Sequence, residues 1–218
     1  MAYFLPEAAC IRIQQTCTEG YGKILKNDVC GFIGYRIDSC RIKEDCRMKV
    51  IVINGPMGVG KTTVGKRIAD QNPGTAFIDG DWCMDLHPFI GNQETKTMAV
   101  DNILHMIRNY QKCSACRMVV LVWLMDDPWV IQRIMEGLSA LQAEIKSVTL
   151  VCDRENLIKR WKNDRDCDWR TDEWLNVSLK SLDGFASMDH AIDTSHLSAD
   201  RIADLIMQYE TVSVSGFH

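Results

Sequence analysis

Apolar and polar residues follow two different periodicities between residues 48 and 208 of the chain. Five short apolar stretches have the length and the β-branched content of buried parallel strands. They lie at residues 50–53, 75–79, 117–125, 147–153 and 190–194. Between these stretches, apolar residues recur every three or four positions, which is the spacing of a helix with one buried face. The pattern predicts helices after residue 61, over residues 93–112, 128–141, 155–165 and 172–182, and from residue 199 onward.

Several helix boundaries are marked by residues that cap helix ends. Asp127 followed by Pro128 is the sequence of an N-cap and a first-turn proline, and Thr171 and Ser198 precede two further helical patterns. The sequence "NPG" at residues 72–74 is expected to end the helix that follows the first strand. Strands that alternate with helices predict an α/β fold, a three-layer sandwich in which a five-stranded parallel sheet carries helices on both faces.

The first part of the chain does not share this pattern. Residues 1–47 lack clear periodicity, hold five of the ten cysteines, and end just before the strand-like "MKVIVING". We therefore divide the chain into an N-terminal extension, residues 1–47, and a domain formed by residues 48–218. A zinc finger is not expected in the extension, because its cysteines never form a C-x₂₋₄-C pair. Cys113 and Cys116 form such a spacing elsewhere, without a second pair to complete a metal site.

The composition narrows the classes of partner. The 218 residues carry 25 basic and 29 acidic side chains, a balance that favours neither nucleic acid nor an anionic membrane. No apolar run has the length of a membrane span, and the N-terminus lacks the pattern of a signal peptide. Cysteines in such a chain indicate free thiols in a reducing compartment. We expect a cytoplasmic monomer or homodimer whose partner is a small molecule.

The first strand leads into "GPMGVGKTT", residues 55–63, which fits the G-x-x-x-x-G-K-[ST] motif in full and lies between a predicted strand and a predicted helix. Glycines let the backbone turn its N–H groups toward a phosphate, and the helix N-terminus adds positive potential. Lys61 is predicted to reach the terminal phosphates of ATP, and the Thr62 hydroxyl to hold Mg²⁺. The predicted nucleotide-binding residues of this loop are Gly55, Met57, Gly58, Val59, Gly60, Lys61, Thr62 and Thr63.

Two carboxylates follow the second strand. Asp79 and Asp81 lie where ligands of open parallel sheets bind. A hydroxyl acceptor benefits from a carboxylate that takes its proton, whereas a phosphate acceptor needs an arginine clamp, and residues 82–95 contain neither lysine nor arginine. We therefore interpret Asp81 as a catalytic base and Asp79 as a Mg²⁺ ligand that acts through water. Flat apolar walls for a ring could come from Trp82, Phe89 and Trp123.

From Met48 to about Glu210 the chain resembles the P-loop kinases of the nucleoside/nucleotide kinase-like group, which includes adenylate, shikimate and gluconate kinases and chloramphenicol phosphotransferase. The resemblance rests on "GPMGVGKTT", "IDGDW", "ENLIKRWKNDR" and "IDTSHLSADRIADLI". The stretch "DGDWCMDLHPF" is also similar to bacterial proteins of this group that are described only as ATPases or nucleotide kinases. The resemblance implies a P-loop NTPase fold, a five-stranded parallel sheet and a helical lid over ATP.

The resemblance also assigns roles to residues of the lid. In the group, arginines on and after the helix that follows the fourth strand contact adenine and phosphates. Arg160 and Arg165 lie nearest to those positions, although their spacing is one residue longer than in adenylate kinases, and Arg170 is a third candidate. We also include Thr194, in the C-terminal segment, among the nucleotide-binding residues.

The absence of two further motifs narrows the function. A guanine-reading N-K-x-D segment is missing after the fourth strand, where the sequence reads "CDREN". A motor-type ATPase would need a pair of acidic residues at the end of an apolar strand. Asp126 and Asp127 stand at such a place, but Asp127 is better explained as a helix cap. The sequence therefore predicts an ATP- and Mg²⁺-dependent kinase of a small-molecule hydroxyl, such as a nucleoside, a sugar or an antibiotic. A nucleoside monophosphate kinase and a slowly hydrolysing nucleotide switch remain as alternatives.

Overall fold

The computed structural model describes residues 47–164 and 170–208, all of which belong to the compact unit Asp45–His218. The predicted N-terminal extension, residues 1–47, lies outside the described residues except for Arg47, and so does Arg165. Among the described helices, none is long and apolar enough to cross a membrane.

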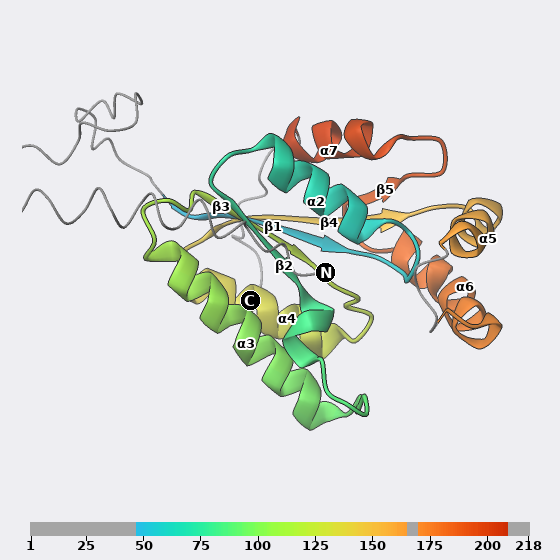
Figure 1. Cartoon of the computed structure of the whole chain (residues 1–218), viewed down its shortest axis with the longest axis horizontal. Helices are drawn as coiled ribbons and strands as arrows, with labels where there is room; N and C mark the ends of the chain where they lie inside the picture. Colours follow the sequence, from blue (N-terminus) through green and yellow to red (C-terminus); the bar gives the residue numbers. More distant parts are fainter. Residues whose placement is uncertain (1–46, 165–169, 209–218) are drawn as a thin grey trace, which may run out of the picture. The chain divides into compact units, whose positions relative to one another are not determined.

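Five parallel strands form one sheet in the order β2-β3-β1-β4-β5 (Figure 1). The predicted five-stranded parallel sheet and three-layer fold are thus confirmed. The stretch predicted at residues 117–125 forms a strand only as far as residue 122. Beyond it, the backbone N–H of Trp123 still donates to the Ile53 carbonyl at 3.2 Å, and the backbone N–H of Met125 donates to the Asn54 side chain at 2.8 Å. The strand bounds are Lys49–Asn54 (β1), Thr75–Asp79 (β2), Met118–Val122 (β3), Glu144–Val151 (β4) and Ala191–Asp193 (β5).

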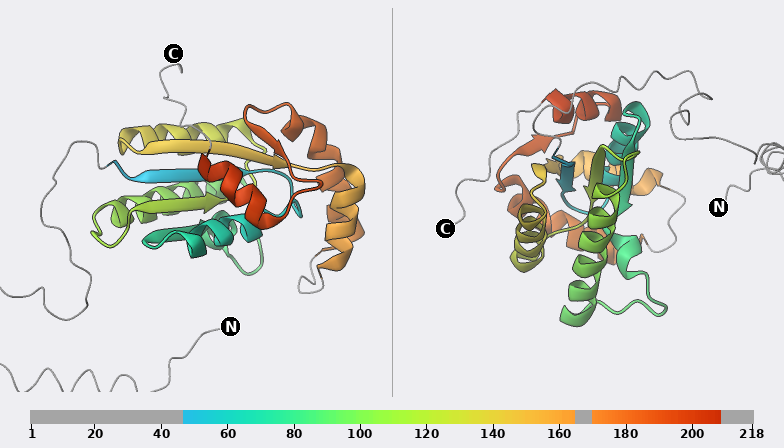
Figure 2. Two further views of the ribbon diagram at one scale, coloured as in Figure 1. Left: turned by 90° about the horizontal axis from the view of Figure 1, so that it is seen from above. Right: turned by 90° about the vertical axis from the view of Figure 1, so that its left-hand side faces the viewer.

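Helices cover both faces of the sheet. Figure 2 shows α2 and α7 on one face and α3 and α4 on the other. The alternating residues of β1 explain this arrangement, since Ile51 and Ile53 pack with α2 and α7, whereas Val50 and Val52 pack with α3 and α4. The helix bounds are Lys61–Gln71 (α2), Gln93–Gln111 (α3), Pro128–Ala140 (α4), Arg154–Asn163 (α5), Asp172–Ala186 (α6) and Ala199–Gln208 (α7).

The predicted helix caps are present. The Asp127 carboxylate accepts a hydrogen bond from the Trp129 backbone N–H at 3.0 Å, and Pro128 opens α4. The Thr171 hydroxyl accepts from the Trp174 backbone at the start of α6, and the Ser198 hydroxyl accepts from the Arg201 backbone at the start of α7. Each cap gives a partner to a backbone donor that the helix itself leaves without one.

The carboxyl ends of the parallel strands meet at one edge of the sheet. The P-loop follows β1 there, and a short 3₁₀ helix, Gly80–Met84 (η1), follows β2. Helices α5 and α6 lie beyond the same edge in Figure 1. The sequence analysis did not predict η1. The Asp79 carboxylate caps the start of this helix by accepting a hydrogen bond from the Asp81 backbone N–H at 3.2 Å.

Candidate functional site

The P-loop backbone has a shape that only glycine allows at its first position. Gly55 has φ 139°, and a Cβ there would lie 2.3 Å from the Leu150 carbonyl oxygen. At Gly58, with φ 80°, a Cβ would lie 2.9 Å from the Trp161 ring. The loop is therefore packed between β4 and α5. Gly55 and Gly58 are required by packing as well as by backbone conformation, whereas Gly60, with φ 106°, is required by conformation alone.

Asn54 fixes the start of the loop and was missed from the sequence. Its side chain is fully buried, accepts from the backbone N–H groups of Gly55 and Met125 at 2.8 Å each, and donates to the Met125 carbonyl at 3.0 Å. These bonds join the end of β1 to the segment after β3. A polar residue that ends an otherwise apolar strand directly before the first P-loop glycine is the signal that could have identified it.

Lys61 folds back over the loop. Its Nζ donates to the carbonyl oxygens of Gly55 at 2.8 Å and Pro56 at 3.0 Å. Burial lowers the pKa of Lys61 to about 8, against the opposing effect of the negative charges of Asp81 and Asp79. The ammonium group therefore lies inside the phosphate cradle, close to both carboxylates that were predicted from the sequence. The negative charge of a bound polyphosphate would stabilise the protonated form of Lys61, which burial disfavours.

A chain of side-chain contacts connects α2, β2 and β3 at the mouth of the loop. The Thr62 hydroxyl donates to Asp79 Oδ2 at 3.1 Å. The Trp123 indole Nε1 donates to Asp81 Oδ1 at 3.1 Å. Sequence reasoning offered Trp123 only as a flat wall, and the structure shows that its N–H orients the predicted base. Within the described part of the chain, Asp81 Oδ2 makes no hydrogen bond, so this oxygen can accept a proton from a ligand.

The surroundings of Asp81 favour its protonated form. Although the residue reaches the surface, loss of hydration raises the pKa of Asp81, and the negative charge of Asp79 adds to this effect. The Lys61 charge and the Trp123 hydrogen bond act in the opposite direction. A carboxylate whose pKa lies above the ordinary range for aspartate is a stronger proton acceptor once it is ionised.

The donor set at the loop mouth fits Mg²⁺. A hydroxyl and a carboxylate, from Thr62 and Asp79, lie 3.1 Å apart, and hard oxygen donors of this kind suit Mg²⁺, which is held through one or two protein groups, water and substrate phosphates. Among residues 47–164 and 170–208, no group of three His, Cys, Asp or Glu side chains is arranged as a metal site. A site of this type therefore needs the nucleotide to complete it.

Arg160 has a different environment from the one expected. Its guanidinium donates to the Val59 carbonyl at 2.9 Å, to Thr194 Oγ1 at 2.8 Å and to the Thr194 carbonyl at 2.5 Å. Thr194 is itself fully buried and donates to the Val151 carbonyl at 2.8 Å. The two predicted residues are thus brought together, but they tie α5, the P-loop and the end of β5 to one another. Their predicted contacts with a nucleotide stay predictions.

Arg170 is the described lid arginine whose charge acts on Lys61. It contributes to the lowered pKa of Lys61, lies 5.1 Å over the Trp161 ring and forms an ion pair with Asp164 at 2.7 Å. Trp161 in turn packs on Gly58 of the P-loop. The sequence named Arg170 only as a third candidate, because spacing along the chain does not reveal that an aromatic ring holds it beside the loop.

The remaining predicted loop residues differ in exposure. Val59 is buried, and the Met57 carbonyl accepts a hydrogen bond from the Ser178 hydroxyl of α6 at 2.7 Å. Gly60 and Thr63 lie at the start of α2, where Thr63 is exposed. The loop is therefore supported from α5 and α6 while its helix end faces solvent.

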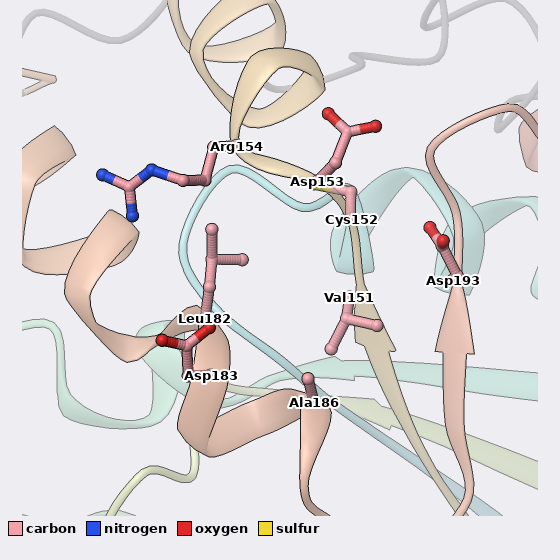
Figure 3. A pocket seen from close by; sticks show the side chains of 8 residues that line it. All are labelled: Val151, Cys152, Asp153, Arg154, Leu182, Asp183, Ala186 and Asp193. Atoms are coloured by element: carbon pink, nitrogen blue, oxygen red, sulfur yellow. The ribbon is translucent and has the colours of Figure 1, made fainter.

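A cavity of about 340 Å³ lies elsewhere, between the ends of β4 and β5 and helix α6 (Figure 3). It contains none of the predicted site residues. Two of the carboxylates that line it already accept hydrogen bonds from residues nearby in the sequence. Asp153 accepts from the Asn156 backbone N–H at 2.7 Å, and Asp193 accepts from the Ser195 hydroxyl at 2.6 Å. The chemistry of the described residues therefore centres on the P-loop and not on this cavity.

Comparison with known families agrees with this geometry. A family model described as an AAA domain matches residues 51–176, more than half of the chain. The chain belongs to this family. The matched residues include the P-loop, Asp79, Asp81 and Trp123. No curated protein sequence matches the chain significantly.

Several solved structures share the fold of this AAA domain, although their sequence identity to the chain is low. The Deinococcus radiodurans tunicamycin resistance protein is 21% identical with a TM-score of 0.55, over 73% of this chain and 94% of that one. A gluconokinase from Sinorhizobium meliloti 1021 is 15% identical with a TM-score of 0.52, over 74% and 98%. A shikimate kinase from Bacteroides thetaiotaomicron is 17% identical with a TM-score of 0.50, over 74% and 96%. The predicted P-loop kinase-like fold is confirmed.

Proposed function

We propose that the protein is an ATP- and Mg²⁺-dependent phosphotransferase that acts on a hydroxyl of a small molecule. The observation that carries the proposal is the position of Asp81. Its carboxylate shares the P-loop mouth with Lys61, is oriented by the Trp123 indole at 3.1 Å, and precedes a stretch, residues 82–95, without lysine or arginine. A base without a phosphate clamp suits a hydroxyl acceptor.

The proposed reaction follows from these positions. The acceptor hydroxyl gives its proton to Asp81 Oδ2 as its oxygen forms a bond to the terminal phosphorus of ATP. The bond between that phosphorus and the bridging oxygen breaks, and ADP leaves with the electron pair. The Asp81 proton then passes to solvent. Phosphoryl transfer needs mainly positioning and charge neutralisation, which the loop amides and Lys61 supply.

The other groups of the site position the nucleotide. When bound with ATP, Mg²⁺ would neutralise phosphate charge, and Thr62 and Asp79 would hold it, Asp79 through water. Arg170, which lies over the Trp161 ring that packs on Gly58 and whose charge acts on Lys61, is proposed to meet charge on the transferred group. Arg160 supports the loop through Val59 and acts as a positioning residue.

The names of the structural neighbours support an acceptor of this class. Two of them are a gluconokinase and a shikimate kinase, and a third is a tunicamycin resistance protein. Their identities to this chain are too low to transfer a substrate. They support transfer to a small molecule in general, and the absence of lysine and arginine from residues 82–95 supports a hydroxyl rather than a phosphate as the acceptor.

A screen of acceptors for ADP release tests the proposal. The panel holds hydroxyl compounds (gluconate, shikimate, nucleosides and tunicamycin) and, separately, nucleoside monophosphates. We expect ADP release to be stimulated by a hydroxyl compound, with the phosphate found on that compound. Stimulation by monophosphates alone would instead identify a nucleoside monophosphate kinase. Slow release that no acceptor stimulates would identify a nucleotide switch.

A further inference from the structure

Large apolar side chains crowd the segment that follows the proposed base. We call residues 82–92 the acceptor loop. Exposed fractions are 75% for Trp82, 37% for Leu86, 67% for Phe89 and 48% for Ile90. Apolar side chains of this size are usually buried in folded proteins, and a group of them exposed on one segment marks a binding surface. In Figure 1 the chain between β2 and α3 projects from the sheet as such a segment.

The acceptor loop is anchored at both ends. At its start, the Cys83 carbonyl accepts a hydrogen bond from the Asn102 side chain of α3 at 2.9 Å. At its end, the Thr95 hydroxyl donates to the Ile90 carbonyl at 2.7 Å, and Asn92 and Thr95 form a capping box at the start of α3. The exposed rings are therefore carried by a segment that the helix holds in place.

The charges of the loop exclude one class of occupant. Residues 82–95 carry no lysine or arginine. The acidic Asp85 lies 3.3 Å from His87 within the loop. A phosphorylated or otherwise anionic body would thus find no lysine or arginine there, and the histidine of the loop is paired with Asp85. An uncharged apolar body would cover the rings at no electrostatic cost.

We propose that the acceptor has an uncharged, ring-bearing apolar body, which lies on Trp82 and Phe89 while one of its hydroxyls reaches Asp81. Trp82 follows Asp81 directly in η1, and Asp81 is fixed by Trp123, so the backbone carries the exposed Trp82 ring one residue from the proposed base. This proposal rests on the function proposed above and narrows the acceptor class within it. Compounds that are polar on all sides, such as sugar acids, are poor acceptors in this view.

The first test uses turnover. Phenyl β-D-glucoside and methyl β-D-glucoside present the same sugar hydroxyls with and without a ring, and they are compared with the acceptors found in the screen. We expect ring-bearing compounds to be the better acceptors. For these, Trp82→Ala and Phe89→Ala each raise the acceptor KM about tenfold or more, because a ring loses its apolar partner. The KM for ATP stays unchanged.

A control separates loss of an aromatic ring at this place from loss of one elsewhere. Trp174 of α6 is 46% exposed and lies outside the acceptor loop, so Trp174→Ala is expected to leave the acceptor KM unchanged. If the best acceptor is polar on all sides, or if the two loop variants leave its KM at the wild-type value, the proposal is wrong.

The second test needs no turnover and so remains informative if the proposed function fails. N-phenyl-1-naphthylamine, a neutral aromatic fluorophore, is titrated into the full chain. We expect its fluorescence enhancement in the wild type, in Lys61→Ala and in Asp81→Asn, and at least tenfold weaker binding in the Trp82→Ala/Phe89→Ala double variant. Trp174→Ala is the matched control.

Two outcomes of this titration overturn the proposal. Equal binding of the fluorophore by the double variant and the wild type would show that the loop does not hold apolar rings. A change of oligomeric state in the double variant, measured by sedimentation and with fluorophore binding unchanged, would make the loop an interface between copies of the chain. A third outcome bears only on the proposed function. If no acceptor is phosphorylated by the wild type, but its binding of the fluorophore still depends on Trp82 and Phe89, the kinase chemistry is wrong and the apolar binding surface stands.

Discussion

The P-loop follows β1 and the acceptor loop follows β2, two strands that end at the same edge of the sheet with β3 between them, but the two loops differ in how they are packed. In the P-loop, Asn54 is fully buried and satisfied by backbone groups, and Gly55 fits against β4 with no room for a side chain. In the acceptor loop, Trp82 and Phe89 are 75% and 67% exposed. One loop has its backbone shape fixed by contacts within the protein, and the other keeps a large apolar area exposed to water.

This difference is the one that the proposed function would require. A triphosphate has the same shape in every reaction, so a rigid backbone cradle suits it. An acceptor differs from enzyme to enzyme, so its surface is set by exposed side chains on a segment anchored only at its ends. Asp81 stands at the boundary between the two loops, and the following predictions test its neighbours on both sides.

The largest effect is expected for Asp81→Asn. The substitution keeps the shape of the side chain but removes the proton acceptor, and positioned bases contribute roughly 10²- to 10⁴-fold in rate. Turnover with the acceptor should fall by that factor, while ATP affinity changes little because Lys61 and the loop amides remain. Asp101→Asn, exposed on α3, is the control. Wild-type turnover in Asp81→Asn would remove the base from the mechanism and favour the monophosphate kinase.

The same variant is expected to be more stable than the wild type at neutral pH. Burial and the Asp79 charge raise the pKa of Asp81 above its unfolded value of 3.8, so the folded state binds this proton more tightly. Its stabilising contribution is present at low pH and is lost as the pH rises through the folded-state pKa. Asparagine does not ionise, so the gain in Tm should shrink on acidification, as thermal unfolding at several pH values would show.

Lys61→Ala is expected to lower turnover by about 10²-fold or more, roughly 3 kcal/mol, because it removes charge compensation at the terminal phosphates. In the wild type, kcat/KM for ATP should decline as the pH rises above about 8, the pKa to which burial lowers this lysine. Lys66→Ala, on the exposed side of α2, is the matched control. A folded Lys61→Ala protein with near-normal turnover would contradict the P-loop mechanism.

Arg160→Ala separates support of the loop from contact with the nucleotide. The guanidinium makes three hydrogen bonds to Val59 and Thr194, and loss of charged hydrogen bonds typically costs about 1.5 to 3 kcal/mol of unfolding free energy. Denaturant unfolding should show this loss, with Lys159→Ala of the same helix unchanged. A loss of turnover at wild-type stability would instead show that Arg160 acts on the nucleotide directly.

The smallest effect is expected for Asp79→Asn. If Asp79 holds Mg²⁺ through water, the substitution weakens the metal site about tenfold without removing the proton acceptor. Turnover should then require more Mg²⁺ and recover at saturating metal, as a titration at fixed ATP would show. Asp70→Asn, exposed on α2, is the control. A loss that excess Mg²⁺ does not restore would assign Asp79 another role.

The sequence by itself determined the elements with local causes. The P-loop motif, the apolar strands and the caps at Asp127, Thr171 and Ser198 were all predicted, because each depends on residues a few positions apart. The same is true of the two aspartates after β2, whose place at the sheet edge follows from the direction of a parallel strand.

Only the tertiary structure decided which distant side chains meet. Trp123 holds Asp81 from 42 positions away, Asn54 joins β1 to a segment 71 positions on, and Arg160 reaches Val59 across 101 positions. The spacing of residues along the chain does not indicate which of these distant side chains come into contact. For Arg160 it gave an expected nucleotide contact, which stays a prediction. The fold shows that Arg160 also supports the P-loop, because the sheet places β4 beside β1 and β5 beside β4, and so brings α5 against the loop.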